Sequence, residues 1–520
     1  MDELEQLTAE DIIFLQQKGI SPEYIKQQLR RFREGFPRLK ILRPATLNDG
    51  IQQLTRSQEE KYIALYETAR LQGRTMKFVP ASGAATRMFK DLIQIYQQLQ
   101  KKKPLSPKEE VLLQRFIQNL DTFAFYNDLE RVLQKKGYHI KKLIKEDQYL
   151  IILHYLLTSD GLDYAELPKA LLKFHRYPDH ARTPLEEHLV EGALHVQSRD
   201  GRVRIHFTVP KKFQKIIQEY LKSVESQYRH LGAFYDLSYS VQDPSTDTIA
   251  VDLNNFPIRD EHGNLVLRPA GHGALLKNLN DLKGDIVFIK NIDNVVPDPH
   301  KPIVIHYKKV LGGMLIYLQE QVFQFMEQLS QRPSADIVER AFRFIKQHFQ
   351  TPIPAAIAKA SLTEKVTYLR QKLNRPIRVC GIVENKGEPG GGPFWVQDKE
   401  GEISLQIVES AQIDENDAEQ QRIWQSSTHF NPTDIVCGVR DYQGHPFNLL
   451  DFRDEDAGII TIKYWQGNAI KVMELPGLWN GSMAKWLTVF VEVPLETFNP
   501  VKTVFDLLRP KHLPVENELR

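Results

Sequence analysis

Residues 76–88 read MKFVPASGAATRM, a short apolar run followed by five residues with minimal side chains, Ala81 to Ala85. An apolar run that leads through a small-residue loop into a helix-like stretch is the strand–loop–helix pattern of an α/β nucleotide site. Because small side chains let a ligand approach the backbone, the loop N–H groups and the positive end of the following helix can bind phosphate. The same sequence is also compatible with a tight strand-to-helix turn that is packed with small residues and binds no ligand. No Gly-Lys-Ser/Thr follows, which excludes a Walker loop.

The segments that follow extend this pattern over most of the chain. Strand-like apolar runs alternate with helices of ten or more residues, which favours a mostly parallel sheet covered on both faces. We therefore expect an α/β fold with a mostly parallel central sheet flanked by helices. The expected strands cover residues 202–209, 234–241, 247–253, 285–290, 377–383, 434–441 and 458–465.

Helical patterns precede and interrupt this α/β unit. Ser21 and Pro22 are typical of a helix start, at the N-cap and at the first helical position. Three amphipathic segments after Met88 predict an inserted helical subdomain. The expected organisation is an N-terminal helical region at 1–75, an α/β domain at 76–88 and 165–490, a helical insertion at 89–164 and a C-terminal extension at 491–520.

Composition limits the class of protein. The 520 residues are 42% hydrophobic and 26% charged, which is typical of a soluble globular chain. A formal charge of +2 does not favour a nucleic-acid binder, and no apolar run approaches the roughly 20 residues of a membrane span. The two cysteines, Cys380 and Cys437, exclude a disulfide framework. With no signal-peptide pattern at the N-terminus, we expect a cytoplasmic protein without nucleic-acid or membrane partners.

Three charged side chains lie in segments suited to phosphate chemistry. Arg87 ends the small-residue segment and can bind phosphate in a bidentate manner. Lys169 follows Pro168 in LPKALLKFH, which we expect to be a Pro-flanked strand. Asp293 follows the apolar run DIVFIK, where an α/β strand end suits a Mg²⁺ ion bridging phosphates. Taken singly, Lys169 could equally be a lysine on the surface, and Asp293 could equally form an Asx turn that closes the strand.

The order of these segments resembles that of the sugar-1-phosphate nucleotidyltransferases, which include the UDP-sugar pyrophosphorylases and have a GT-A-type nucleotide-diphospho-sugar transferase fold. The pair Pro168-Lys169 resembles the family's P-K element, and Asp293 resembles its metal-binding Asp. Ala85 replaces the second glycine of the opening signature G-x-G-T-R-[LM]. The residues that match this signature are Gly83, Thr86, Arg87 and Met88.

Later segments extend the resemblance. PAGHGALL at 269–276 is similar to the P-G-G-H-G element of UDP-sugar pyrophosphorylases, and SLQIVESAQI at 404–413 is similar to a substrate-side segment. ELPGLWNGSMAKW at 474–486 stands where the family has a second metal-binding Asp, with Asn480 in its place. As a whole, the chain resembles an uncharacterised bacterial family that contains the same set of segments.

The resemblance implies a Mg²⁺-dependent enzyme whose partners are a nucleoside triphosphate and a sugar 1-phosphate. Arg87, Lys169 and Asp293 would be catalytic, with Asp293 as the metal ligand. Glu409 and Asn480 would bind the sugar substrate. The implied nucleotide-binding residues are Ala81, Ser82, Gly83, Ala84, Ala85, Thr86, Gln242, Gly271, His272 and Gly273.

Several readings stay open at this point. Gln242 could equally be an amide in a loop without a ligand, and His272 could equally be a histidine with a structural role. The long insertion and the missing second Asp fit a protein that binds a nucleotide or nucleotide sugar without catalysis. A glycosyltransferase on the same fold is a third reading, disfavoured by the G-x-G-T-R-like loop. The sequence predicts no oligomeric state.

Overall fold

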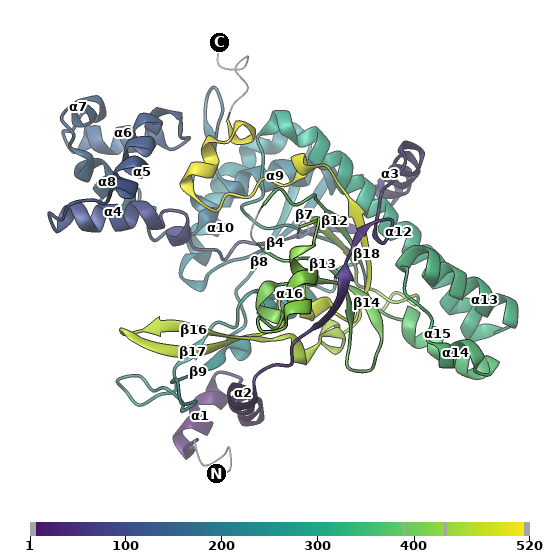
Figure 1. Cartoon of the computed structure of the whole chain (residues 1–520). Helices are drawn as coiled ribbons and strands as arrows, with labels where there is room; N and C mark the ends of the chain where they lie inside the picture. The colour runs from purple at the N-terminus through teal and green to yellow at the C-terminus, as the bar shows by residue number, and fades with distance from the viewer. Residues whose placement is uncertain (1–6, 388–389, 431–433, 514–520) are drawn as a thin grey trace.

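The computed structural model describes residues 7–387, 390–430 and 434–513. At its centre lies a nine-stranded sheet with the order β2-β3-β18-β12-β15-β11-β4-β7-β8 (Figure 1). Its strands are β2 (Thr46–Leu47), β3 (Gly50–Gln52), β4 (Thr75–Pro80), β7 (Arg202–Thr208), β8 (Phe234–Ser240), β11 (Ile286–Ile289), β12 (Ile377–Ile382), β15 (Asp434–Gly438) and β18 (Leu487–Glu492).

The sheet is mostly parallel, as the sequence predicts. Strand β15 runs antiparallel to both of its neighbours, β11 and β12. The other six pairings of this sheet are parallel. In register, Ile289 of β11 pairs with Phe78 of β4. The carboxyl ends of these two central strands therefore lie side by side, at the edge where parallel sheets bind ligands.

Helices cover one face of the sheet: α3 (Arg56–Leu71), α9 (Pro184–His195), α10 (Gln214–Val224) and α12 (Lys301–Gln331). The other face carries α11 (Leu275–Asp281) and a three-stranded sheet of β1 (Lys40–Pro44), β13 (Gly392–Gln397) and β14 (Ile403–Val408). Alternation along β4 explains how one strand serves both layers. Val79 packs with the helices and Phe78 with the opposite layer, because successive side chains point to opposite faces.

Residues 89–164 form a helical layer that projects beside the sheet (Figure 1). Their apolar side chains build a separate core, which also takes in Val501, Val504 and Leu507 from the C-terminal segment. The helices are α4 (Lys90–Gln100), α5 (Pro107–Gln118), α6 (Tyr126–Lys135), α7 (Ile140–Lys145) and α8 (Tyr149–Leu157).

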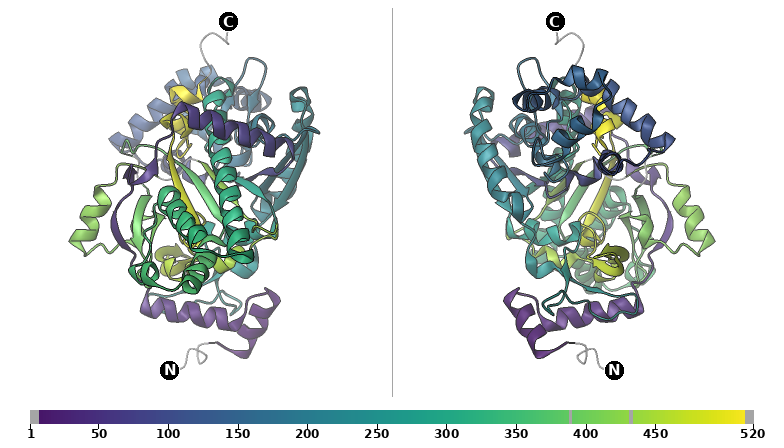
Figure 2. Two further views of the ribbon diagram at one scale, coloured as in Figure 1. Left: turned by 90° about the vertical axis from the view of Figure 1, so that its right-hand side faces the viewer. Right: turned by 90° about the vertical axis from the view of Figure 1, so that its left-hand side faces the viewer.

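The remaining elements lie around these layers. Helices α1 (Ala9–Gln17) and α2 (Pro22–Glu34) pack at one end of the molecule against a four-stranded sheet (Figures 1 and 2). That sheet has the order β10 (Leu267–Arg268), β9 (Thr248–Val251), β17 (Asn468–Glu474) and β16 (Ile459–Trp465). The others are α13 (Ala335–Phe344), α14 (Ala355–Lys359), α15 (Leu362–Leu373), α16 (Ala418–Gln425), β5 (His175–Arg176) and β6 (Ala181–Arg182).

Three expectations need correction. Residues 1–75 are not helical throughout, because 40–52 form the short strands β1 to β3. Lys169 lies in a 3-10 turn, Lys169–Leu171, and not in a strand. The expected strands at 247–253 and 458–465 do form, but in the four-stranded sheet and not in the central one. No helix within the described ranges combines the length and the apolar character that a membrane span needs.

Candidate functional site

The small-residue loop connects β4 to a 3-10 turn, Ala85–Arg87. Both ends of the loop are fixed, since the Ala81 N–H donates to the Thr208 carbonyl (2.8 Å) and the Ala85 N–H to the Leu167 carbonyl (3.2 Å). Ala81 and Ala85 are buried, whereas Ser82, Gly83 and Ala84 are exposed. This arrangement leaves the middle of the loop, and not its two buried ends, to face a ligand.

The predicted P-K pair packs directly against this loop, although the helical insertion separates the two in sequence. Pro168 forms a β-bridge with Ala84. The Lys169 N–H donates to the Gly83 carbonyl at 3.1 Å. A methyl group at Gly83 would meet nothing within 4 Å, so the space above the loop is open.

Lys169 links the loop to the end of β11. Its Nζ lies 2.7 Å from Asp293 Oδ2 and 2.7 Å from the Val501 carbonyl oxygen. The two side chains of the ion pair are 11% and 19% exposed, so solvent reaches both. The Ile292 N–H donates to the Pro80 carbonyl at 3.2 Å, which places the residues before Asp293 alongside the end of β4. Segments 82–87, 169 and 293 therefore meet at the carboxyl edge of the sheet.

Arg87 and Thr86 lie on the exposed side of this cluster. The Thr86 hydroxyl donates to the Ala165 carbonyl at 3.2 Å. Within the described residues, Arg87 takes part in no ion pair with a carboxylate. Because Asp293 neutralises Lys169, the guanidinium of Arg87 is the positive charge left available to an anion.

The C-terminal segment also reaches this site, which the sequence analysis missed (Figure 1, yellow). The Val501 N–H donates to the Asp293 carbonyl at 3.1 Å, and the Val504 N–H to the Met88 carbonyl at 3.1 Å. The Asn499 N–H donates to Asn294 Oδ1 at 2.8 Å. These are long-range backbone contacts, for which the local residue pattern carries no signal.

Three other predicted residues meet on the face opposite α9 and α12. His272 Nε2 lies 3.6 Å from Glu409 Oε1, and its Nδ1 accepts the Leu478 N–H at 3.1 Å. The interaction with His272 lowers the pKa of Glu409 below its usual range. Gly477 separates His272 from Asn480, since a methyl group there would lie 2.8 Å from the imidazole and 3.2 Å from Asn480 Oδ1. Glu409, Asn480 and His272 thus form one polar cluster, in which Glu409 and His272 are partly exposed and Asn480 is buried.

The structure gives Gly271 and Gly273 a packing role. Gly271 has a φ of +75°, and a Cβ there would lie 2.8 Å from Glu474 Oε2. A Cβ at Gly273 would lie 2.2 Å from the Pro476 carbonyl oxygen. The Glu474 side chain and the 475–476 backbone thus account for the absence of a side chain at both positions, and the expected role of the two glycines at the nucleotide stays a prediction.

Gln242 follows β8 at the edge of the central sheet. Its amide Nε2 lies 3.4 Å from Asp247 Oδ1. The end of β8 is held by Asn278 of α11, which donates to the Ser240 hydroxyl (2.7 Å) and to the Val241 carbonyl (2.8 Å). Among the described residues, no contact joins Gln242 to Lys169 or Asp293, so its expected role at the nucleobase stays a prediction.

A metal ion beside the small-residue loop would find a carboxylate ligand in Asp293. Among the described residues, no group of three or more His, Cys, Asp and Glu side chains is arranged to hold a metal. A single carboxylate suits Mg²⁺, which commonly takes its other ligands from water and substrate phosphates. One carboxylate is too few for an ion whose ligands are all protein side chains.

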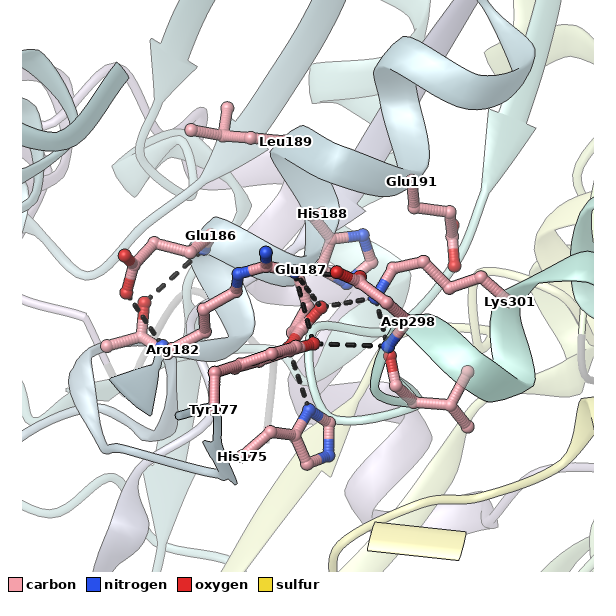
Figure 3. A network of polar contacts seen from close by, with 12 residues as sticks. His175, Tyr177, Arg182, Glu186, Glu187, His188, Leu189, Glu191, Asp298 and Lys301 are labelled. Carbon is pink, nitrogen blue, oxygen red and sulfur yellow. Dashed lines mark hydrogen bonds and ion pairs between the residues drawn. The ribbon is translucent and has the colours of Figure 1, made fainter. Parts of the chain in front are cut away.

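A second, buried polar network lies on α9, which the sequence analysis also missed. Eleven of the twelve α9 residues are buried, Glu187 and Glu191 among them. Glu187 binds Lys301, His175 Nδ1 (2.9 Å) and the Tyr177 hydroxyl (2.9 Å) (Figure 3). Burial alone would raise the pKa of Glu187, but Lys301 and the bond from His175 hold it well below its usual range.

Glu191, one turn further along α9, balances three buried lysines. Its carboxylate lies 2.9 Å from Lys77, 2.8 Å from Lys290 and 3.4 Å from Lys308. Asp434 of β15 pairs with Lys308 and shares the charge. Because these side chains are at most 5% exposed, they fix α9 and α12 to the sheet and do not face a ligand.

Comparison with known proteins identifies the family. The model of the family described as "Domain of unknown function (DUF4301)" matches residues 8–513. The chain belongs to this family. No curated protein matches the sequence.

The DUF4301 chain is also similar to solved structures of UDP-sugar pyrophosphorylases. One is UDP-N-acetylglucosamine pyrophosphorylase from Trypanosoma brucei, at 11% identity and a TM-score of 0.48, covering 98% of this chain and 80% of that one. Another is a mutant UDP-glucose pyrophosphorylase from Leishmania major in complex with UDP-glucose, at 12% identity and a TM-score of 0.42, covering 96% and 79%.

Proposed function

We propose that this DUF4301 protein is a sugar-phosphate nucleotidyltransferase. It would join a nucleoside triphosphate to a sugar 1-phosphate and release pyrophosphate. The observation that carries the proposal is the contact of Lys169 with both the Gly83 loop and Asp293 at the carboxyl edge of the sheet. A loop with open backbone and two opposite charges beside it is the chemistry that phosphate binding requires.

The reaction is a displacement at phosphorus. A phosphate oxygen of the sugar 1-phosphate attacks the α-phosphorus of the triphosphate. The bond from this phosphorus to the bridging β-phosphate oxygen breaks, and pyrophosphate leaves with that oxygen and its electron pair. Such a transfer needs alignment and charge neutralisation more than covalent catalysis by the protein.

The residues at the loop divide these tasks. Ser82, Gly83 and Ala84 present open backbone to the nucleotide phosphates, and Arg87 binds the departing pyrophosphate. Lys169, which pairs with Asp293 in the structure, would neutralise the reacting phosphates when that carboxylate binds Mg²⁺ instead. Asp293 would hold Mg²⁺ together with the substrate phosphates, and the ion would neutralise charge on the phosphoryl oxygens.

The second polar cluster suits the sugar. Glu409 is a half-buried carboxylate, and its lowered pKa keeps it ionised at neutral pH. An ionised carboxylate accepts hydrogen bonds from sugar hydroxyls, and the Asn480 amide both donates and accepts. His272 holds Glu409 in position through its Nε2, while its Nδ1 is fixed by the backbone of Leu478.

A pyrophosphate-release screen tests the proposal. Purified full-length protein receives Mg²⁺, each nucleoside triphosphate and a panel of sugar 1-phosphates. We expect release that requires one triphosphate and one sugar 1-phosphate together, and that falls at least tenfold in Arg87→Gln. Arg56→Gln is the matched control, because Arg56 is 92% exposed on α3 and pairs with the neighbouring Glu60 of the same helix. Absence of release from every pair would contradict the proposal.

One observation favours a second candidate, a nucleotide-binding protein without turnover. Lys169 already satisfies Asp293 and the Val501 carbonyl, so a bound Mg²⁺ must compete with an ion pair. This candidate predicts that a nucleoside triphosphate raises the melting temperature and that no pyrophosphate is released in the screen. Pyrophosphate release would exclude it.

A further inference from the structure

A cavity of about 540 Å³ lies between the helical insertion and the α/β unit. Helix α6 contributes Asn127 and Arg131 to its lining, and the β5–β6 hairpin contributes Arg176 and His180. Helices α9 and α10 complete it on the other side. None of the lining residues belongs to the proposed nucleotide site, so this cavity is a separate feature. Its volume is in the range of small-molecule pockets.

The carboxylates that line the cavity already have partners. Asp128 pairs with Arg131 on the same helix. Asp179 lies 2.5 Å from His180 Nδ1. Glu186 accepts the Tyr220 hydroxyl at 2.5 Å and lies 3.5 Å from Lys173. The negative charge of the lining is therefore compensated locally.

Arg176 is the cation that remains. Its Nη2 donates to the Phe123 carbonyl at 3.4 Å. Its Nε is buried and has no hydrogen-bond partner among the described residues, and no carboxylate lies within ion-pair distance of the side chain there. Arg176 as a whole is only partly buried and lines the cavity, so an oxyanion there can bind its guanidinium without competition from a carboxylate of the described residues.

The hairpin holds Arg176 in place. His175 and Tyr177, on either side of Arg176, both bind Glu187 Oε1 at 2.9 Å. Figure 3 shows Arg182 lying across Tyr177 and reaching Asp298, to which its Nη1 donates at 2.7 Å. Because these contacts fix the backbone around Arg176 before any ligand arrives, binding would order few further groups.

We propose that this cavity binds a small phosphorylated molecule, with its phosphate on the guanidinium of Arg176. A guanidinium offers paired N–H donors that match phosphate oxygens. The Asn127 amide, which also lines the cavity, is available to the rest of the ligand. Since the lining comes from both the insertion and the α/β unit, the ligand would hold the two together. This site is independent of the proposed transferase activity.

Binding of two probes to the full chain tests the site. Inorganic phosphate and glucose 6-phosphate are titrated by calorimetry at constant ionic strength, with glucose and acetate as the uncharged and carboxylate comparisons. We expect saturable binding of both phosphate probes and at least a tenfold weaker affinity in Arg176→Gln, with Arg176→Lys in between. Arg56→Gln, on the exposed surface of α3, should bind as the wild type does.

Two further measurements test whether the phosphate probes bind in this cavity. Arg87→Gln removes the free cation of the nucleotide site and should leave this binding unchanged. Hydrogen exchange of the wild type should slow at 124–131 and 173–181 when glucose 6-phosphate binds. Loss of affinity in Arg87→Gln but not in Arg176→Gln would assign the phosphate to the nucleotide site and overturn the proposal. No saturable binding of either phosphate probe, equal binding of acetate, or unchanged exchange at both segments would also overturn it.

Discussion

Two clusters of charged side chains differ in how completely they are paired. On α9, Glu187 and Glu191 are at most 2% exposed, and buried cations surround both. At the carboxyl edge of the sheet, Lys169 and Asp293 stay 11% and 19% exposed, beside an exposed Arg87 without a carboxylate among the described residues. The first cluster is closed, and the second is open to a ligand.

The difference follows from the cost of removing charge from water. A buried ion must be paired and hydrogen-bonded, because its desolvation costs several kcal/mol, of the order of the pairing energy itself. A partly exposed ion pays little of this cost, so a cation can remain unpaired where an anionic substrate reaches it. The buried cluster therefore stabilises the fold, and the edge cluster is the candidate for chemistry.

The largest expected effect comes from breaking the closed cluster. Among the described residues, Glu191→Gln leaves Lys77 without a carboxylate partner, and it leaves Lys290 and Lys308 with Asp434 alone. We expect the free energy of unfolding to fall by about 3–5 kcal/mol, measured by urea denaturation. Glu219→Gln is the control, because Glu219 is 66% exposed on α10, and it should change stability by less than about 0.5 kcal/mol. Equal effects of the two variants would show that the buried charges do not hold α9.

A substitution in the open cluster should reduce activity and leave stability nearly unchanged. Asp293→Asn is expected to lower the rate of pyrophosphate release by about 10²–10³-fold, because one preorganised electrostatic contact is lost. Its melting temperature should change little, since the pair is partly exposed. Asp91→Asn, an exposed carboxylate in the first turn of α4, is the control and should keep full activity. A large loss of stability without loss of activity would place Asp293 with the structural ions.

The buried His206 extends the comparison to the pH dependence of stability, because its recorded hydrogen-bond partners are neutral hydroxyls. His206 lies between the Ser238 and Ser240 hydroxyls, and burial lowers its pKa to about 4. The unfolded chain takes up this proton near pH 6.5, so stability should fall as pH drops from 6.5 towards 4. At about 1.4 kcal/mol per pKa unit, the loss from this histidine is on the order of 3 kcal/mol.

The slope of stability against pH is the quantity to measure. His206→Gln should make that slope shallower between pH 6.5 and 4, whatever it does to stability at pH 7. His262→Gln is the control, because His262 is 76% exposed, and it should leave the slope unchanged. An unchanged slope in His206→Gln would mean that the folded protein protonates His206 as readily as the unfolded chain.

The smallest expected effect concerns the start of α9. Thr183 is fully buried and accepts the Glu186 N–H at 3.3 Å, while Glu186 accepts the Thr183 N–H at 2.8 Å. Thr183→Ala should cost about 1–2 kcal/mol of stability, measured by urea denaturation. Ser361→Ala removes an equivalent but exposed cap from α15 and should cost less. Equal costs would show that burial adds nothing to the cap.

Part of this comparison could be predicted from the sequence. The strands β11 and β12 are buried along their whole length and β7 over most of its residues, and their alternation with helices predicted the mostly parallel sheet. The order of the loop, Lys169 and Asp293 predicted residues that do lie together, although Lys169 and Asp293 are 124 positions apart. Motif order was informative because the three segments share one edge of one sheet.

The rest depends on contacts that no local pattern records. Strands β1 to β3 have five residues or fewer and lie between helices, so no periodicity reveals them. The contact between Lys169 and the Val501 carbonyl spans 332 positions and uses a backbone oxygen, which any residue type supplies. On α9, Glu187 and Glu191 look in sequence like solvated charges, and only packing under the sheet shows that they are buried.

Hydrogen exchange with and without a nucleoside triphosphate and Mg²⁺ tests the central claim most directly. The claim is that the open edge cluster binds the nucleotide and the closed α9 cluster does not. We predict slower exchange at residues 82–88 and 290–294, with no change along α9. Unchanged exchange at 82–88 and 290–294 at saturating nucleotide, or protection confined to other parts of the chain, would contradict the assignment of this edge as the nucleotide site.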